Sequence, residues 1–368
     1  MLGAGRPARA PGSEAQVVLL ANLFPIILVS LSAAFVSAPF LIRAAVRLGL
    51  VDLPGSQPHK WHSDATPMAG GSAVAFALAV SYVTVVPRPD RTVGFILLAG
   101  AIVFLEGLLD DRRTLPAWAK FAGQVLAALV LWFGGVSVHL FRADIVNLMI
   151  TLLWIVGMIN AFNFIDSMDG LSLGLAAIAA AFFLLVTVDS QQVSLTTLSA
   201  AILGSTIGVF YFNAAPARTF IGDSGSQLLG LLLAATGMAY NPIGLPNAVS
   251  WFVPILVLGV PVFNLVLVVV SRLLRGRRVF QAYKDHVSHR LVRMGLDRTR
   301  TVLTLQLAAI ALGLVAFIAL GGTPFSANLL FGVVVLAGIA GVAFLERTFP
   351  REKGDPARSA PAENQESS

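Results

Sequence analysis

The chain has 368 residues, of which 57% are hydrophobic and only 12% are charged, and its mean hydropathy is +0.82. About a quarter of the residues of a soluble domain are charged, so the composition indicates a protein that crosses a membrane several times. Cysteine is absent, which excludes a disulfide framework and a thiolate metal site. A net charge of +6 is explained by basic cytoplasmic loops, and with no soluble domain we expect no nucleic-acid partner.

Segments of about 20 apolar residues can span the hydrocarbon core of a bilayer, and they recur along the chain. They predict an all-α polytopic membrane protein with about eleven transmembrane helices. The expected spans are residues 17–41, 70–86, 93–109, 119–136, 145–162, 171–188, 195–212, 227–239, 251–271, 302–320 and 327–345. We expect a disordered tail at 1–16, a single transmembrane domain at 17–346 that includes a cytoplasmic loop at 272–301, and a disordered cytoplasmic tail at 347–368.

The distribution of charge sets the expected orientation. With eleven spans the termini lie on opposite sides, and the N-terminal side holds five of the 25 basic residues. The other side holds the remaining 20, nine of them between Arg272 and Arg300. By the positive-inside rule, we expect the N-terminus outside and the C-terminus in the cytoplasm, in the inner (plasma) membrane of the cell. Every polar motif below falls on the basic, cytoplasmic side.

The first cytoplasmic loop contains His59-Lys60-Trp61-His62 and then Pro67-Met68-Ala69-Gly70-Gly71. Lys60 and the two histidines could hold a phosphate, whereas the alternative is a solvated basic loop that obeys the orientation rule. The proline and glycines mark turns and the return of the chain into the membrane.

Two adjacent carboxylates, Asp110 and Asp111, follow the apolar segment 93–109. They repel each other unless a cation or a proton lies between them, so they suit Mg²⁺ or a general base. Lys120 could neutralise a phosphate beside them. The alternative is a helix end with exposed acids that arginines anchor at the membrane surface.

A dense polar stretch runs from Asn160 to Gly170, with two amides and two carboxylates in the ten positions 160–169. Asn160 and Asn163 are three apart, as are Asp166 and Asp169, so each pair shares a face if the helix continues. Their oxygens are hard ligands for Mg²⁺ and acceptors for a nucleobase or ribose. Helix capping explains one such residue but not four, so we interpret the stretch as a ligand site.

The segment Phe220-Ile221-Gly222-Asp223-Ser224-Gly225 opens the apolar segment 227–239. Alone, its Gly-Asp-Ser-Gly is typical of an ordinary turn. At the start of a helix the backbone N–H groups attract anions, Asp223 could hold a cation there, and Phe220 could stack on a base.

The last polar motif is His286-Val287-Ser288-His289-Arg290. Zinc requires three or four ligands, and no third histidine or cysteine is nearby, so we interpret the motif as a phosphate clamp. The alternative for the arginines before it is a basic surface helix that rests on anionic lipid.

In this order and on one side of the membrane, the motifs resemble those of the polyprenyl-phosphate N-acetylhexosamine-1-phosphate transferases. That family includes the MraY and WecA enzymes and the eukaryotic dolichol-linked counterpart. The resemblance covers about residues 52–291. The matching pieces are Pro67-Met68-Ala69-Gly70-Gly71, Asp110-Asp111 with Leu115-Pro116 and Lys120, Asn160 to Gly170, Asn213 with Pro216-Ala217, Phe220 to Ser226, and His286 to Arg290.

The resemblance implies that a polyprenyl (undecaprenyl) phosphate attacks the β-phosphate of a UDP-N-acetylhexosamine and releases UMP. It leaves open a direct attack or a covalent phospho-aspartate intermediate. The roles it implies are catalysis for Asp110, Asp111, Lys120 and Asp166; Mg²⁺ or Mn²⁺ binding for Asn163 and Asp223; nucleotide-sugar binding for Asp169, Phe220, Gly222, His286, His289 and Arg290; and lipid-phosphate binding for Lys60 and Lys120. Family members are often dimers, so a homodimer is a further option.

Three positions depart from the family pattern. Ser167 replaces the glycine of the first Asp-Gly pair in the Asn160–Gly170 stretch. Ser288 replaces the middle histidine of the motif His286–Arg290, and Asn264 stands where many WecA-like members have Asp. The reduced histidine content favours the WecA-like branch over the branch that transfers muropeptides. We therefore expect a simple donor such as UDP-GlcNAc, used in the first membrane step of cell-envelope polysaccharide synthesis.

Two other functions compete with this interpretation. A polytopic transporter would place its polar residues near the middle of the membrane, whereas these motifs lie at one side. A catalytically inactive relative that binds lipid phosphate is the second alternative, which Ser167 and Ser288 suggest.

Overall fold

The computed structural model describes residues 11–53, 65–86, 89–242, 247–276 and 285–349. Within these ranges the regular structure is almost entirely helical, apart from one short antiparallel pair of strands in which Val51 lies opposite Pro67. Several of the helices are long and apolar enough to cross a membrane. The prediction of an all-α polytopic membrane protein is therefore confirmed.

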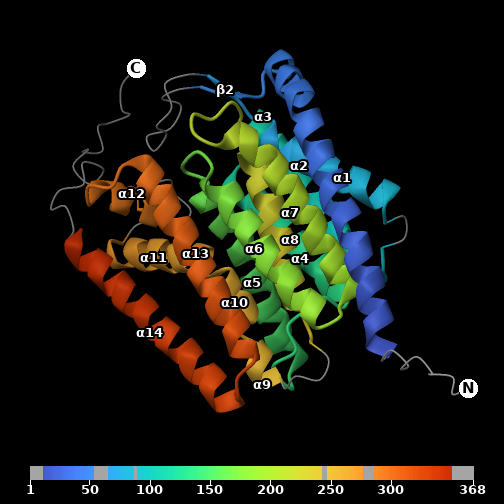
Figure 1. Ribbon diagram of the computed structural model, residues 1–368. Helices are drawn as coiled ribbons and strands as arrows, with labels where there is room; N and C mark the ends of the chain where they lie inside the picture. The colour runs from blue at the N-terminus through green and yellow to red at the C-terminus, as the bar shows by residue number, and fades with distance from the viewer. Residues whose placement is uncertain (1–10, 54–64, 87–88, 243–246, 277–284, 350–368) are drawn as a thin grey trace, which may run out of the picture.

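Figure 1 shows the helices packed as one bundle, with the strands at one end. In chain order the elements are α1 Pro11–Leu48, β1 Val51–Asp52, β2 Thr66–Pro67, α2 Gly70–Thr84, α3 Arg91–Arg112, α4 Ala117–Phe133, α5 Asp144–Ile165, α6 Leu171–Asp189, α7 Val193–Asn213, α8 Gly222–Ala239, α9 Asn247–Ser250, α10 Val253–Val257, α11 Gly259–Leu274, α12 Val287–Arg293, α13 Arg298–Leu320 and α14 Pro324–Thr348.

Ten of the eleven expected spans each coincide with one helix, and the span 251–271 covers the two helices α10 and α11, but fewer helices are long and apolar enough to cross a membrane. The described residues contain seven such helices, or eight if the pair Ala248–Val257 and Gly259–Leu274, bent by 72°, is one span. The helix α2 has only 15 residues, a length of about 22 Å against a hydrocarbon core of about 30 Å. The count of eleven therefore stays a prediction.

The first helix begins earlier than the sequence suggests. We expected a tail over residues 1–16, but α1 begins at Pro11. Proline is compatible with the first turn of a helix, where its missing N–H would have no intrahelical partner. Residues 1–10 and 350–368, which hold most of the two expected tails, lie outside the described residues.

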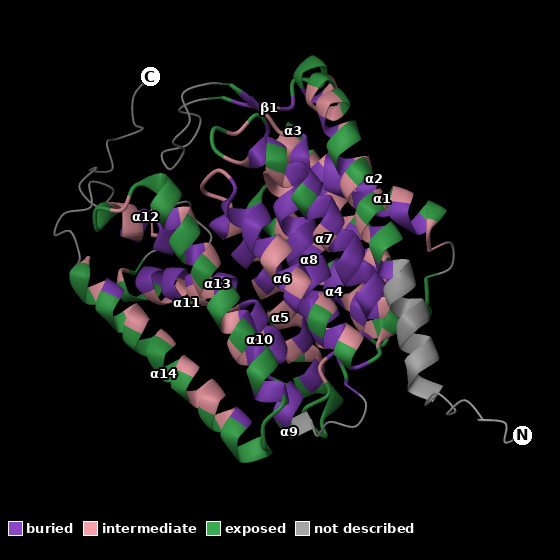
Figure 2. Cartoon of the chain, in the orientation of Figure 1, coloured by how far each residue is buried: buried purple, intermediate pink, exposed green. Residues whose placement is uncertain are grey.

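The bundle has a buried centre and a lipid-like periphery. In their most apolar windows, α6 and α7 have 67% and 72% of residues buried, against 6% in α14 (Figure 2). Gly208 lets α7 approach α1 closely, because a Cβ at this position would lie 2.6 Å from the backbone oxygen of Leu31. Small residues at helix contacts are the usual solution in membranes, where close packing drives association.

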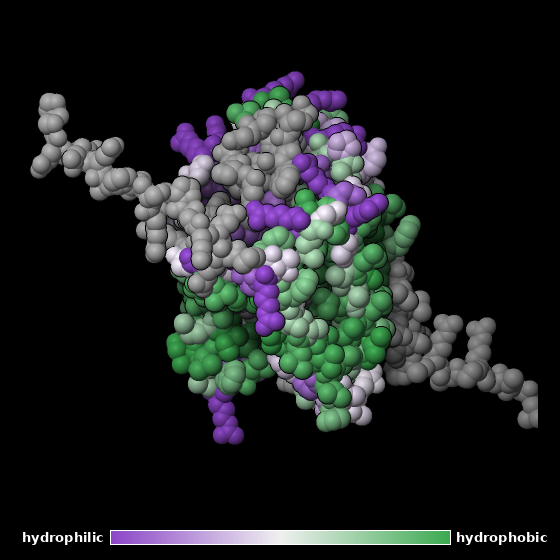
Figure 3. Space-filling model, turned by 90° about the vertical axis from the view of Figure 1, so that its left-hand side faces the viewer, coloured by the Kyte–Doolittle hydropathy of each residue, from purple (hydrophilic) through white to green (hydrophobic). Residues whose placement is uncertain are grey.

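The expected cytoplasmic loops meet at one end of the bundle. The strands, the end of α3 and the short helix α12 lie towards the upper end of Figure 1, whereas α9 lies at the opposite end. In Figure 3 hydrophilic side chains gather towards the same upper end, above a broad hydrophobic band. This arrangement brings the polar motifs together at one edge of the apolar region.

Candidate active site

A cavity of about 900 Å³ opens among these loops. It is lined by residues from several of the predicted motifs, although they are far apart in the chain. The predicted site residues that line it are Asp110, Asp111, Lys120, Asn163, Asp166, Asp169, Phe220, Gly222, Asp223 and His286. His289 and Arg290 do not line it, and Lys60 lies outside the described residues.

Lys120 lies between two carboxylates in this cavity. It is in the first turn of α4, and its ammonium group is 3.0 Å from Oδ2 of Asp110 and also pairs with Asp223. The second oxygen of Asp110 accepts a 2.7 Å hydrogen bond from the backbone N–H of Leu115, which fixes the turn between α3 and α4. The positively charged ammonium group of Lys120 therefore lies at the junction of three helices, α3, α4 and α8.

Asp111 caps the start of α8. Its carboxylate accepts hydrogen bonds from the backbone N–H groups of Asp223 (2.7 Å) and Ser224 (3.2 Å) and from the hydroxyl of Ser224 (2.7 Å). A carboxylate is stabilised at a helix N-terminus, where backbone N–H groups lack intrahelical partners. Gly222 permits this approach, since its φ is +67° and a Cβ there would lie 2.6 Å from Asp111.

The dense polar stretch forms the end of α5 and the loop that follows it. Asn163 is in the last turn, where its amide is 3.3 Å from the hydroxyl of Ser226 and also hydrogen-bonds to Asp223. Asn160, one turn earlier, donates to Gln124 at 2.7 Å and so joins α5 to α4. Asn163 is thus directed to the carboxylate of α8, while Asn160 has a contact that holds two helices together.

Asp166 and Asp169 follow in the loop before α6. Asp169 accepts a 2.9 Å hydrogen bond from the backbone N–H of Ala217, which ties this loop to the one before α8. Burial raises the pKa of Asp166 from its usual 3.8 to about 8, and the charges of Asp223, Asp111 and Asp169 raise it further. A cation in the cavity would reverse this effect.

Phe220 is held by the first loop. Its backbone N–H donates to the carbonyl of Pro67 at 2.9 Å, and its own carbonyl accepts from Gly70 at 2.9 Å. The Pro-Met-Ala-Gly-Gly motif therefore supports the Phe220 segment through backbone contacts, a role that the sequence did not suggest.

The histidine motif forms α12 and the residue that precedes it. His286 lines the cavity, and its ring centroid lies 5.8 Å from that of Phe164. Arg290 instead is buried and pairs with Glu346 at 2.6 Å and with the hydroxyl of Ser271 at 2.8 Å. His289 is buried as well. The expected phosphate-binding roles of His289 and Arg290 stay predictions, and the visible contacts of Arg290 hold α12 against α11 and α14.

Several cavity residues escaped the sequence-based interpretation. Arg272 is fully buried, lines the cavity and lies 5.3 Å from the ring centroid of Phe164. Arg298 and Gln306 line it from α13. In the sequence Arg272 and Arg298 resemble other cytoplasmic arginines, so only their contacts distinguish them.

The charge of the cavity favours cations. Among its described lining residues are six carboxylates and three residues with a fixed positive charge, Lys120, Arg272 and Arg298. The described residues form no group of three or more His, Cys, Asp or Glu side chains that could hold a metal. Mg²⁺ needs fewer protein ligands, because it is commonly bound by one or two carboxylates together with substrate phosphates. The amide of Asn163 and the carboxylate of Asp223 fit that requirement.

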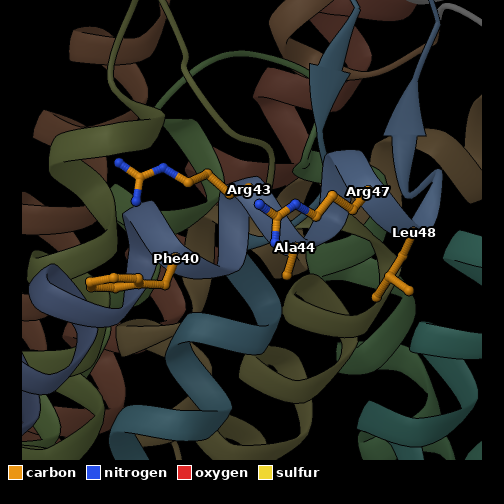
Figure 4. Close-up of a pocket in the computed structure, with 5 residues that line it drawn as sticks. All are labelled: Phe40, Arg43, Ala44, Arg47 and Leu48. Atoms are coloured by element: carbon orange, nitrogen blue, oxygen red, sulfur yellow. The ribbon is translucent and has the colours of Figure 1, made fainter.

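A second hollow, of about 480 Å³, lies at the end of α1 (Figure 4). Arg43 and Arg47 extend from successive turns of the helix there, and Arg43 lies 5.7 Å from the ring centroid of Phe40. The short strand β1, whose Asp52 lines the large cavity, follows this helix end directly. The hollow therefore adds basic surface to the end of the bundle that carries the site.

Comparison with known proteins gives consistent relatives. The profile of glycosyl transferase family 4 matches residues 93–241. The chain is 33% identical over 360 residues to the decaprenyl-phosphate N-acetylglucosaminephosphotransferase of Mycobacterium tuberculosis, covering 85% of this chain and 87% of that protein. It is 27% identical over 321 residues to the probable undecaprenyl-phosphate N-acetylglucosaminyl 1-phosphate transferase of Bacillus subtilis, covering 84% and 88%.

A more distant branch is also similar. The phospho-N-acetylmuramoyl-pentapeptide-transferase of Heliobacterium modesticaldum is 32% identical over 275 residues, covering 67% of this chain and 80% of that protein. The helical membrane bundle, its cavity and these relatives define a membrane transferase of glycosyl transferase family 4. Within that class, the chain belongs to the polyprenyl-phosphate N-acetylhexosamine-1-phosphate transferases, as the motifs predicted.

Proposed function

We propose that the protein transfers GlcNAc-1-phosphate from UDP-GlcNAc to a polyprenyl phosphate such as undecaprenyl phosphate, and releases UMP. The observation that carries this proposal is the convergence of Lys120, Asp110 and Asp223 in the cavity at one edge of the apolar bundle. The names of two relatives, which specify N-acetylglucosamine and an undecaprenyl or decaprenyl phosphate, support the choice of sugar and acceptor.

The edge position of the cavity suits a reaction between a water-soluble donor and a lipid acceptor. Phosphoryl transfer depends mainly on positioning and on neutralising charge, which the residues of this cavity can supply. Lys120 would hold the phosphate of the lipid, with Asp110 fixing the direction of its ammonium group at 3.0 Å. An oxygen of the lipid phosphate would form a bond to the β-phosphorus, and the bond from that phosphorus to the oxygen bridging it to the α-phosphate would break, so that UMP leaves.

We favour direct attack over a phospho-aspartate intermediate. The two oxygens of Asp111 accept hydrogen bonds from Asp223 and Ser224, and Asp110 is held by Leu115 and Lys120. A carboxylate engaged in this way is a weaker nucleophile than a free one. The contacts therefore support positioning roles for both acids.

We propose Mg²⁺, or Mn²⁺ in its place, as the cofactor, with Asn163 and Asp223 as its protein ligands. The metal would neutralise negative charge on the donor diphosphate. The excess of carboxylates among the described lining residues supports this assignment. The negative charges of the three carboxylates around Asp166, which a metal ion would offset, support it as well. Asp166 would act beside the metal site and lose its proton when a cation enters.

For the rest of the donor, we propose Asp169 and Phe220 at the uracil and His286 at the diphosphate. All three line the cavity, and Phe220 presents an aromatic ring on which a base could stack. A membrane transporter is less well supported, because this cavity lies at one end of the bundle.

We also propose that the protein lies in the inner (plasma) membrane with its C-terminus and cavity in the cytoplasm, where UDP-sugars are made. Polysaccharide synthesis at the cell envelope would consume its lipid-linked product. The basic end of α1 beside the cavity supports this orientation. Homodimer formation stays a prediction from the resemblance.

The experiment is an assay of purified protein with Mg²⁺, undecaprenyl phosphate and a panel of UDP-N-acetylhexosamines. We expect UMP release with UDP-GlcNAc, and none when the lipid is omitted. Exchange of labelled UMP into UDP-GlcNAc without lipid would contradict direct attack, and no release with any donor would contradict the proposed activity.

A further inference from the structure

A hydrogen bond joins two serines that lie 121 positions apart. The hydroxyls of Ser167 and Ser288 are 2.9 Å from each other. Ser167 is in the loop between Asp166 and Asp169 and lines the cavity, whereas Ser288 is fully buried in the first turn of α12. Both positions depart from the family pattern, and the structure places the two departures in contact.

The helix α12 is also held by residues that do not line the cavity. The backbone N–H of Val287 donates to the side-chain oxygen of Asn264 at 3.0 Å. Arg290 pairs with Glu346 and Ser271. Neither Asn264, Glu346 nor Ser271 lines the cavity, so these contacts fix α12 to α11 and α14. The hydrogen bond between Ser167 and Ser288 is a separate contact, and it joins α12 to a residue that does line the cavity.

The serine pair therefore connects two walls of the site. One wall is the loop with Asp166 and Asp169, and the other is His286, which immediately precedes α12. Because Ser288 is fully buried, its hydroxyl cannot turn to water if the loop moves away. An unsatisfied buried hydroxyl is unfavourable, so the bond resists separation of the two walls.

We propose that Ser167 and Ser288 are a positioning pair that sets the distance between the Asp166–Asp169 loop and His286, and thereby the affinity for the nucleotide-sugar donor. The inference rests on the proposed function, since it assigns these walls to the donor. The pair does not touch the lipid phosphate site at Lys120, so it acts on one substrate and leaves the other unchanged.

The test is a double-mutant cycle with Ser167→Ala, Ser288→Ala and the double variant. We expect each single variant to raise the KM for UDP-GlcNAc about three- to tenfold, as for the loss of one hydrogen bond. The kcat and the KM for undecaprenyl phosphate should stay within about twofold of the wild type. The double variant should match the single variants, because either substitution already breaks the shared bond.

Ser172→Ala is the matched control. Ser172 is fully buried near the start of α6, and its hydroxyl has no hydrogen-bond partner among the described residues. We expect its kinetic constants to equal those of the wild type. Ser167→Thr keeps a hydroxyl at the edge of the cavity and should restore the wild-type KM for the donor.

Three results would overturn the inference. The KM effects of the single variants could add in the double variant, or Ser172→Ala could raise the donor KM equally. The substitutions could also change kcat and both KM values together with the melting temperature, which would indicate a general structural role. A wild-type protein that releases no UMP would overturn the proposed function itself, whereas an active wild type with any of these results would overturn this inference alone.

Discussion

The carboxylate of Asp111 accepts a 2.7 Å hydrogen bond from the backbone N–H of Asp223, so the end of α3 caps the start of α8. Two acids that the sequence motifs assign to different parts of the site are thus adjacent, one through its side chain and the other through its backbone. The position of the Asp223 carboxylate depends on this cap. Stability and activity are therefore linked at Asp111.

Substitution of Asp111 should lower both the stability and the activity of the protein. In Asp111→Asn, one carboxylate oxygen becomes an NH₂ group that cannot accept the hydrogen bonds from Ser224. We expect a loss of about 1–3 kcal/mol in the free energy of unfolding and a large fall in UMP release. Thermal unfolding in detergent measures the first effect. Asp90→Asn is the control, since Asp90 caps the other end of α3 through a single oxygen that asparagine retains. Loss of activity at unchanged stability would contradict the capping role.

A methyl group at position 222 should disrupt the same contact. In Gly222→Ala the new Cβ would lie 2.6 Å from Asp111, at a φ of +67°. Gly276→Ala is the matched control, because Gly276 has a φ of +62° but no atom within 4 Å of its Cβ position. We expect Gly222→Ala to lose most UMP release, whereas Gly276→Ala bears only backbone strain of about 1 kcal/mol. Equal losses in the two variants would show that backbone strain alone is responsible.

Removal of the cation at position 120 should affect turnover. In Lys120→Gln the carboxylates of Asp110 and Asp223 lose the charge that they share. We expect kcat for UMP release to fall about 100-fold, which is typical for loss of one group that stabilises developing charge. Arg112→Gln removes the same charge from an exposed position near the end of α3 and should stay close to wild-type activity. Similar activities of the two variants would contradict a role of Lys120 in the reaction.

Asp166 should make Mg²⁺ binding dependent on pH. Its pKa in the metal-free protein is raised to about 8, so the proton is bound below that pH. Protonation then contributes stability that is present below the usual pKa of 3.8 and is lost as the pH rises through about 8. A bound cation favours the ionised form, so the apparent affinity for Mg²⁺ should rise between about pH 6 and about pH 8 and then level off.

Calorimetric titration of Mg²⁺ at several pH values measures this dependence. Asp166→Asn cannot titrate and should show a flatter profile, with fewer protons released on binding. The same slope in the wild type and in Asp166→Asn would exclude Asp166 as the group responsible.

The sequence predicted the helices and the gathering of motifs well, for physical reasons. Each expected apolar segment is helical, with 251–271 broken into α10 and α11, because a lipid environment requires backbone hydrogen bonds to be satisfied within the segment. The polar motifs meet at one end because successive spans reverse direction and the basic loops share one side. Ten of the predicted site residues accordingly line one cavity.

The partners of individual side chains were not predictable in the same way. Nothing near Arg290 in the sequence points to Glu346, which lies 56 positions away. The contact of Ser167 with Ser288 and the cap that Asp111 forms on α8 likewise depend on how distant helices pack. Local sequence patterns specify the elements, but contacts across the bundle depend on side-chain geometry.

The most direct test is to measure UMP and polyprenyl-diphospho-GlcNAc together, using purified protein with labelled UDP-GlcNAc, undecaprenyl phosphate and Mg²⁺. We predict equal amounts of the two products, with neither formed when Mg²⁺ is chelated. Folded protein that forms neither product from any UDP-N-acetylhexosamine, or that forms them equally well without a divalent metal, would contradict this prediction.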